Sequence, residues 1–192
     1  MFLFYMIIAC KQEEIVAKET YDTYCGLCHG YEGEGYLAPQ ANALSNPEFL
    51  AAATDDFLRY AIIYGRPETK MSPWGEEVGG PLNQQDVDRI IAHMRTWDTL
   101  EPAEIHDISI TGDKENGAQL YEMHCSFCHG AELEGASAMS LNNPTFLETV
   151  SDGFLLHAIE VGRSGTPMLS YAETLSETEM KDLVVFIRSF AQ

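Results

Sequence analysis

"YCGLCHGYEG" at 24–33 and "HCSFCHGAEL" at 124–133 are two nearly matching decapeptides within one chain of 192 residues. Each contains the pattern Cys-x-x-Cys-His, which brings two thiols and an imidazole close together along the chain. The residues of the two patterns are Cys25, Cys28, His29, Cys125, Cys128 and His129. Such a pattern is typical of a site for a metal or a covalently attached cofactor. Its repetition predicts two copies of one site.

The likeness between the two halves of the chain extends beyond these decapeptides. The segment 46–66 matches 143–163 at an offset of 97 residues, and 11 of its 21 positions are identical. The segment 82–97 matches 175–190 at an offset of 93, so the first copy has four extra residues, which we place in a loop at 76–80. A repeat of this length indicates an internal duplication.

The duplication predicts two domains, at 13–99 and 112–192. Between them, the stretch 100–111 contains a proline and little periodicity, which is typical of a linker. Residues 1–12 precede the repeat and have a separate character.

The final segment of each copy has the apolar spacing of an amphipathic helix. Its apolar residues are Val87, Ile90, Ile91, Met94 and Trp97 in the first copy and Met180, Leu183, Val184, Ile187 and Phe190 in the second. Residues suited to helix N-caps begin other segments, at Asn46, Thr54, Asn143, Ser151 and Ser176. With no convincing strand pattern, we expect an all-α fold of two small helical bundles. Domains of ~80 residues have small hydrophobic cores and commonly need additional stabilisation, which a bound cofactor would supply.

A Cys-x-x-Cys pair alone fits a zinc half-site, a redox dithiol or a disulfide. Zinc needs two further ligands at each site, and the chain has only one other cysteine, Cys10. A thioredoxin-like dithiol needs a βαβ context, which the helical patterns do not provide. The histidine directly after the second cysteine instead favours covalent haem attachment.

With these motifs, the chain resembles the class I cytochromes c in a two-domain, dihaem form, over nearly all of 13–192. The resemblance implies two covalently bound haem c groups, with His29 and His129 as iron ligands on one side. It also implies a methionine ligand on the other side. Met71 and Met168 stand at matching positions in the loops "TKMSPW" and "GTPMLS", 42 and 39 residues after those histidines.

The resemblance suggests further site residues. In family members with a proline at the position of Pro39, its carbonyl accepts a hydrogen bond from the proximal histidine, so we expect Pro39 to do so for His29. The second copy has Met139 there, and another backbone carbonyl could serve His129. Arg66 and Arg163 could pair with haem propionates, or could simply be cations at a helix C-terminus.

The family also packs its first helix against its last through a small residue and an aromatic one. Gly117 and Tyr121 match this pair, with Phe186 and Phe190 opposite them. Their counterparts in the first copy are Ala17 and Tyr21, opposite Trp97.

The net charge of −19, from 30 acidic and 11 basic residues, argues against binding of nucleic acid because phosphates would be repelled. It fits either simple solubility or attraction of a redox partner protein with a basic docking patch.

The opening "MFLFYMIIAC" is too short for a bilayer span, which needs roughly 20 apolar residues. Its end resembles a bacterial lipoprotein signal, so we expect Cys10 to be lipidated and to anchor the protein to a membrane. The alternative is a frayed apolar terminus.

A haem iron bound by histidine and methionine has no open position, which favours electron transfer over catalysis and gives no reason to expect a small-molecule substrate. We therefore expect an electron carrier, not an enzyme, at the periplasmic or extracytoplasmic face of a membrane, in a respiratory or photosynthetic complex. The alternative is a dihaem redox enzyme of the peroxidase or sulfur-compound dehydrogenase type, with one open or replaceable haem ligand.

Overall fold

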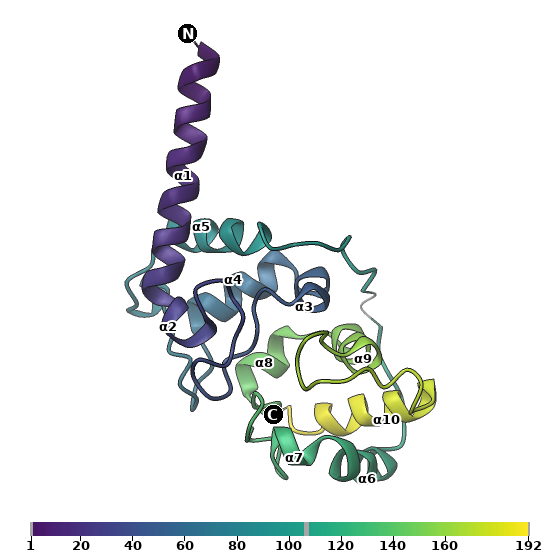
Figure 1. Ribbon diagram of the computed structural model, residues 1–192. Helices are drawn as coiled ribbons and strands as arrows, with labels where there is room; N and C mark the ends of the chain where they lie inside the picture. The colour runs from purple at the N-terminus through teal and green to yellow at the C-terminus, as the bar shows by residue number, and fades with distance from the viewer. Residues whose placement is uncertain (1, 106–107, 192) are drawn as a thin grey trace.

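The computed structural model describes residues 2–105 and 108–191, with side chains from residue 11 onward. Its helices form two groups, one from each half of the sequence, which lie side by side (Figure 1). The described residues contain no β-strand, only an isolated bridge between Gly75 and Leu82. The all-α prediction is therefore confirmed.

The two groups of helices repeat the same order. The first contains α1 (Phe2–Tyr24), α2 (Gly26–His29), α3 (Pro47–Ala52), α4 (Asp55–Tyr64), the short 3-10 helix η1 (Glu76–Val78) and α5 (Gln84–Arg95). The second contains α6 (Lys114–His124), α7 (Ser126–His129), α8 (Pro144–Thr149), α9 (Asp152–Val161) and α10 (Glu177–Arg188). The helix η1 lies at the predicted four-residue insertion, which has no counterpart in the second group.

Side-chain caps begin these helices at the predicted residues. The side chains of Asn46 and Asn143 accept hydrogen bonds from the amides of Phe49 and Phe146, at 2.9 and 3.1 Å. Thr54, Ser151 and Ser176 cap the next helices in the same way. Each cap satisfies a backbone donor that the helix leaves free.

The first and last helices of each copy cross at close range. In the second copy, a Cβ atom on Gly117 would lie 2.1 Å from the carbonyl oxygen of Asp182, so only glycine fits there. The ring of Tyr121 lies 5.3 Å from that of Phe186. In the first copy, Tyr21 contacts Trp97 edge to face at 5.1 Å. The predicted small-plus-aromatic crossing is present in the second copy, and its aromatic part is present in the first.

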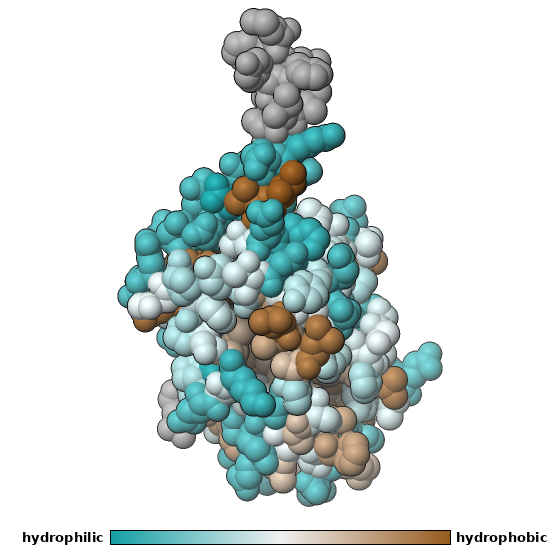
Figure 2. All heavy atoms as spheres, turned by 60° about the vertical axis from the view of Figure 1, so that its left-hand side comes forward, coloured by the Kyte–Doolittle hydropathy of each residue, from teal (hydrophilic) through white to brown (hydrophobic). Residues whose placement is uncertain are grey.

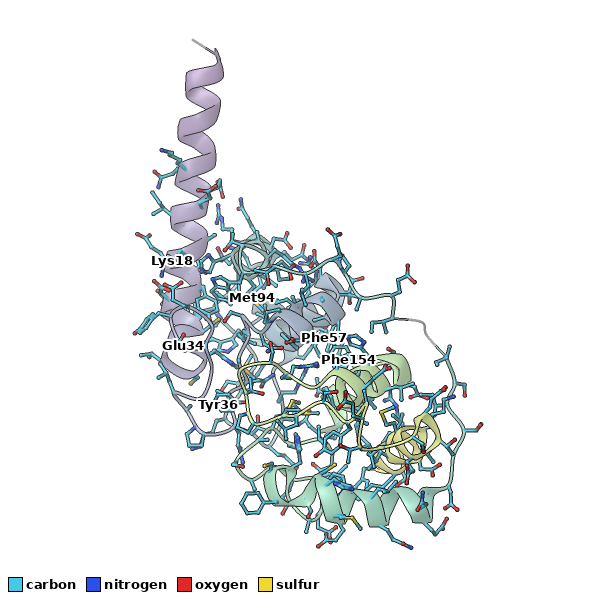
Figure 3. The ribbon with its side chains drawn as sticks, turned by 45° about the vertical axis from the view of Figure 1, so that its right-hand side comes forward. Lys18, Glu34, Tyr36, Phe57, Met94 and Phe154 are labelled. Carbon is cyan, nitrogen blue, oxygen red and sulfur yellow. The ribbon has the colours of Figure 1, made fainter. Side chains whose placement is uncertain are left out.

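The two helix groups meet across a local pseudo-two-fold arrangement that the sequence did not reveal. At its centre, the rings of Phe57 and Phe154, which are equivalent residues of the duplication, stack at 5.3 Å (Figure 3). Around them, α3 contacts α9, and α4 contacts α8. Because α8 and α9 are the second-copy equivalents of α3 and α4, these two contacts are equivalent. Each domain thus presents the same helix pair to the other, as in an isologous dimer.

The chain enters this structure through α1, which extends from the first helix group (Figure 1). Cys10 lies within α1, but its side chain is outside the described residues, so its lipidation stays a prediction. No described helix combines the length and apolar character needed to cross a membrane. The predicted linker, as far as it is described, contains no helix, and its amide at Ile110 bonds to the Asp152 carboxylate at 3.1 Å.

Candidate functional site

Each Cys-x-x-Cys-His motif forms one helical turn at the end of the crossing helix. In the first copy, the carbonyl of Cys25 accepts hydrogen bonds from the amides of Cys28 and His29, at 3.1 and 2.9 Å. The second copy repeats both bonds at the same distances. This turn brings both thiols and the imidazole of each motif into one short segment, α2 or α7.

A glycine and a tyrosine fix the chain direction directly after each turn. Gly30 and Gly130 both have φ of 84°, which residues with a side chain rarely adopt. The hydroxyl groups of Tyr21 and Tyr121 donate to the carbonyls of these glycines, at 2.9 and 2.7 Å. The sequence placed both tyrosines in the helix crossing, but gave no sign of this second contact.

The histidine rings are oriented by backbone carbonyls. Nδ1 of His29 lies 2.9 Å from the carbonyl oxygen of Asn42, and Nδ1 of His129 lies 2.9 Å from that of Met139. Because a carbonyl only accepts, Nδ1 carries the proton and Nε2 keeps its lone pair for a metal. The prediction that Pro39 accepts from His29 is wrong.

The error over Pro39 has a structural origin. The first copy has three more residues than the second between its motif and its capping asparagine, and these fall at 39–41. Gln40, within this insertion, has φ of 69°, and the Ala41 amide bonds to the Ala38 carbonyl at 3.2 Å. The chain therefore forms an extra turn at 39–41, and the carbonyl that reaches His29 is that of Asn42. Asn42, and not Pro39, is the structural equivalent of Met139.

The burial of the motif histidines and of the first cysteine of each motif favours their neutral forms. Burial lowers the pKa of His29 and of His129, although the hydrogen bond to a carbonyl opposes this, so both rings are neutral at pH 7. Burial raises the pKa of the Cys25 thiol to about 12 and that of Cys125 to about 11.

The three alternatives to haem attachment find no support in the described residues. The four motif cysteines are free thiols, which excludes a structural disulfide between them. No group of three or more His, Cys, Asp or Glu side chains among the described residues could hold a metal ion. A zinc site therefore lacks a ligand set, and the absence of strands in the described part removes the thioredoxin-like context.

The two methionine loops are closed by the same pair of hydrogen bonds. The amides of Arg66 and Arg163 donate to the carbonyls of Met71 and Met168, both at 2.8 Å. The amide of each methionine in turn contacts a threonine hydroxyl at 3.1 Å. Both methionines are half-buried. The loops are thus structural equivalents, as the alignment predicted, and iron ligation by these residues stays a prediction.

Arg66 and Arg163 lie at the boundary between the domains. The guanidinium of Arg66 contacts the rings of Phe57 and Phe146, one from each domain, and Arg163 repeats this with Phe154 and Phe49. Each also donates to the carbonyl of the preceding glycine, at 3.1 and 2.8 Å.

Within the described residues neither arginine forms an ion pair, and burial lowers the pKa of each guanidinium to about 10. A buried cation without a carboxylate partner is costly. The carboxylates of a haem would relieve that cost. The free Nε2 atoms, the neutral thiols and these arginines are therefore a set of groups that fits a haem in each copy.

The other described histidines have packing roles. The ring of His93 packs against those of Tyr21 and Trp97, at 5.3 and 4.9 Å. His124 packs against Tyr171 at 5.6 Å, and His157 is half-buried on α9. His106 lies outside the described residues.

Comparison with known proteins gives one matching family model, "Cytochrome C oxidase, cbb3-type, subunit III", over residues 16–94 and 112–187. Two relatives are described as "Cbb3-type cytochrome c oxidase subunit FixP". The one from Bradyrhizobium sp. is 22% identical over 90% of this chain and 59% of its own length. The one from Azorhizobium caulinodans is 24% identical over 86% of this chain and 55% of its own. The chain thus spans little more than half the length of these relatives.

A shorter relative and a solved structure add to this. "Cytochrome c55X" of Pseudomonas aeruginosa is 39% identical over 71 residues, which are 35% of this chain and 53% of that protein. A chain of the Kuenenia stuttgartiensis reducing HAO-like protein complex superposes with a TM-score of 0.56. It is 22% identical and covers 92% of this chain and 96% of its own, which shows a shared fold.

Proposed function

Because the chain belongs to the family of cbb3-type cytochrome c oxidase subunit III, a dihaem cytochrome c, we propose that it relays single electrons from a membrane-associated donor to an acceptor. It binds two covalently attached haem c groups, one in each matched segment. These groups supply a reversible one-electron change at iron. The protein residues attach the groups, orient the iron ligands and exclude water.

The residues of the two motifs have distinct tasks in this proposal. Both thiols of each turn would form the thioether links to a haem, and Nε2 of His29 or His129 would bind its iron. The carbonyls of Asn42 and Met139 hold each ring in one orientation and raise its basicity as a ligand. The sulfur atoms of Met71 and Met168 would supply the second protein ligand of each iron.

The observation that carries the proposal is the repeated construction of the two methionine loops. In both loops the arginine amide donates to the methionine carbonyl and the methionine amide donates to a threonine hydroxyl, which favours the same kind of ligand for each iron. Histidine and methionine together would leave no position for a substrate at either iron, which suits one-electron transfer. Arg66 and Arg163 would hold the haem propionates.

Exposure of the purified haem-loaded protein to carbon monoxide and to hydrogen peroxide tests this closed coordination. We expect that neither reduced haem binds carbon monoxide and that neither oxidised haem reacts with peroxide. Rapid binding at one haem would instead support the dihaem enzyme, with that haem as its reaction site. Met71→Ala and Met168→Ala serve as positive controls, because each opens one position.

The proposed partner is a redox protein with a basic docking patch. The chain has a net charge of −19, and on the face in Figure 2 hydrophilic residues dominate while apolar residues form small separate patches. Leu27 and Phe127, which precede the second cysteine of each motif, are 71% and 91% exposed and offer an apolar contact at each site. Electron transfer to a basic partner should slow as salt is raised, because ions screen the attraction. A rate that does not depend on salt would contradict this partner.

We propose an extracytoplasmic, membrane-tethered location, with Cys10 as the lipidated residue. Mass spectrometry of the protein isolated from membranes should find a lipid on Cys10 at a new N-terminus, and Cys10→Ser should release the protein from membranes. An unmodified Cys10 in a membrane-bound protein would rule out this anchor.

A further inference from the structure

The two halves of the domain boundary share one hydrogen bond and differ in the next. The side-chain amide of Asn46 donates to the carbonyl of Ser164 at 2.9 Å, and that of Asn143 donates to the carbonyl of Pro67 at 2.7 Å. Both pairs are equivalent under the duplication. These bonds align each arginine loop with the opposite domain.

Glu48 makes a second contact in only one half. Its Oε2 accepts from the amide of Ser164 at 3.1 Å and from the hydroxyl at 2.9 Å. In the other half, Thr145 stands in place of Glu48, and Pro67 has neither an amide hydrogen nor a hydroxyl. One half of the boundary thus has the bonded pair Glu48 and Ser164. The other half has Thr145 and Pro67 at the equivalent positions and lacks this contact, so the boundary is asymmetric.

This contact brings a carboxylate to one arginine and not to the other. Ser164 directly follows Arg163, whose guanidinium lies over the ring of Phe49, the neighbour of Glu48, at 6.0 Å. The charge of Glu48 acts on Arg163 and opposes the lowering of its pKa by burial. Among the described residues, the charge effect on Arg66 comes from Tyr60, whose hydroxyl is neutral at pH 7 because its pKa is raised, and not from a carboxylate.

Glu48 is ionised at neutral pH. Partial burial tends to raise its pKa, but the hydrogen bonds from Ser164 and neighbouring groups outweigh this and lower the pKa below its usual range. A fixed negative charge thus stands beside the arginine of the second domain, although it belongs to the first domain.

We propose that Glu48 of the first domain lowers the reduction potential of the haem in the second domain and thereby sets the two haem potentials apart. The inference rests on the proposed function, in which Arg163 faces that haem. A nearby anion stabilises the oxidised iron, which carries one more positive charge than the reduced iron. Glu48 also offsets the charge of Arg163, which would otherwise favour reduction. An electron shared by the two haems then resides mainly in the first domain.

The test is a redox titration of the haem-loaded protein followed by NMR, in which the methyl signals of the two oxidised haems are resolved. Met71→His and Met168→His each replace the methionine ligand in one domain. The set of methyl signals that changes in each variant is thereby assigned to that domain. We expect Glu48→Gln, which keeps an acceptor for Ser164 but loses the charge, to raise only the second-domain potential. The expected shift is up to a tenfold change in the ratio of reduced to oxidised haem, or about 59 mV for one electron.

A matched control separates this effect from a general change of surface charge. Glu148 also crosses the boundary, where it accepts from the Tyr60 hydroxyl at 3.2 Å, but it is exposed and, among the described residues, has no hydrogen bond to either arginine loop. Glu148→Gln removes the same charge and should leave the second-domain potential at its original value. Equal shifts in both variants, or no shift in Glu48→Gln, would overturn the inference.

A gain-of-function variant covers the case in which Glu48→Gln folds poorly. Pro67→Ser together with Thr145→Glu rebuilds the missing contact in the other half of the boundary. We expect this double variant to lower the first-domain potential and to bring the two potentials closer together. An unchanged first-domain potential would contradict the inference. If the unmodified holoprotein lacks two methionine-ligated haems, the proposed function fails first and the inference with it.

Discussion

The two domains are most alike in the motif turns and methionine loops, and they differ in the packing of the first helix on the last and in one contact at the domain boundary. The motif turn, the tyrosine contact to the following glycine and the methionine loop repeat with nearly equal distances. By contrast, Tyr21 packs against His93 and Trp97 in the first domain, whereas Tyr121 packs against Phe186 in the second. The duplication has thus kept the groups that attach a cofactor and varied the groups around them.

The acceptors of the histidine rings show how this works. Asn42 and Met139 differ in every property of their side chains, yet both supply a backbone carbonyl at 2.9 Å. The backbone therefore tolerates substitution and even a three-residue insertion beside it. What the pair of domains conserves is the position of an oxygen atom, not an amino-acid type.

Replacement of one methionine ligand should produce the largest difference between the domains. Met168→His exchanges a thioether for an imidazole and should lower the potential of one haem by a large part of the ~0.8 V range that axial ligands cover. The other haem should keep its potential. A titration that follows the red absorption band of methionine-bound oxidised haem checks this. Met139→Leu is the control, because Met139 contributes a backbone oxygen, and it should keep the band of both haems.

The second-largest expected difference is the loss of stability when one methyl group is added at the helix crossing. Gly117→Ala places a Cβ atom against the Asp182 carbonyl and should cost about 1–3 kcal/mol of unfolding free energy. Its counterpart Ala17→Gly has the opposite change of size and should cost about 1 kcal/mol through helix propensity. Denaturant unfolding of the haem-loaded protein measures both. A Gly117→Ala protein as stable as the original would show that the crossing is looser than described.

Variants of Asn143 separate the two bonds that this residue makes. Asn143→Ala loses both the helix cap and the bond to the Pro67 carbonyl, and the cap alone should cost about 0.5–2 kcal/mol. Asn143→Ser keeps a side-chain acceptor for the helix cap and loses the donor across the boundary, for about 0.5–1.5 kcal/mol. Thermal unfolding of both variants checks the order. If the serine variant were as damaging as alanine, the boundary bond would dominate over the cap.

The smallest expected effect is the pH dependence that His93 gives to the first domain. Burial lowers the pKa of His93, with Lys18 acting in the same direction and Asp22 and Glu32 opposing it. A lowered pKa in the folded state means that unfolding takes up a proton, so stability falls as the pH drops from about 6.5 towards the lowered value.

His93→Phe, which copies the second domain, should remove this loss. Compared with the original protein, it should gain less than about 1 kcal/mol between pH 7 and pH 5, because the ring is partly exposed and screened. Denaturant midpoints at the two pH values measure the gain. An equal pH dependence in both proteins would show that His93 does not contribute.

The repeat, the helices and their caps could be predicted because each depends on local chemistry. An asparagine before a proline caps a helix through atoms three residues away, and the crossing needs one small residue opposite an aromatic one. The acceptor of His29 could not be predicted in this way. The sequence shows a three-residue gap between the copies, but only the path of the backbone through Gln40 places that gap before Asn42.

The contacts between the two domains could not be predicted from the sequence either. Phe57 and Phe154 have the spacing of core residues on their helices, and nothing in that pattern distinguishes a domain core from a face that packs on a neighbour. Arg66 and Arg163 were open between two roles for the same reason. Their position between rings of both domains depends on how two complete folds meet.

The most direct test of the whole account is an optical redox titration of the purified holoprotein that includes the weak red band of methionine-bound oxidised haem. The account predicts two low-spin haems, each with this band and each with a raised potential. One high-spin haem, or one haem without the band, would contradict the relay in that domain and make the dihaem enzyme the better explanation.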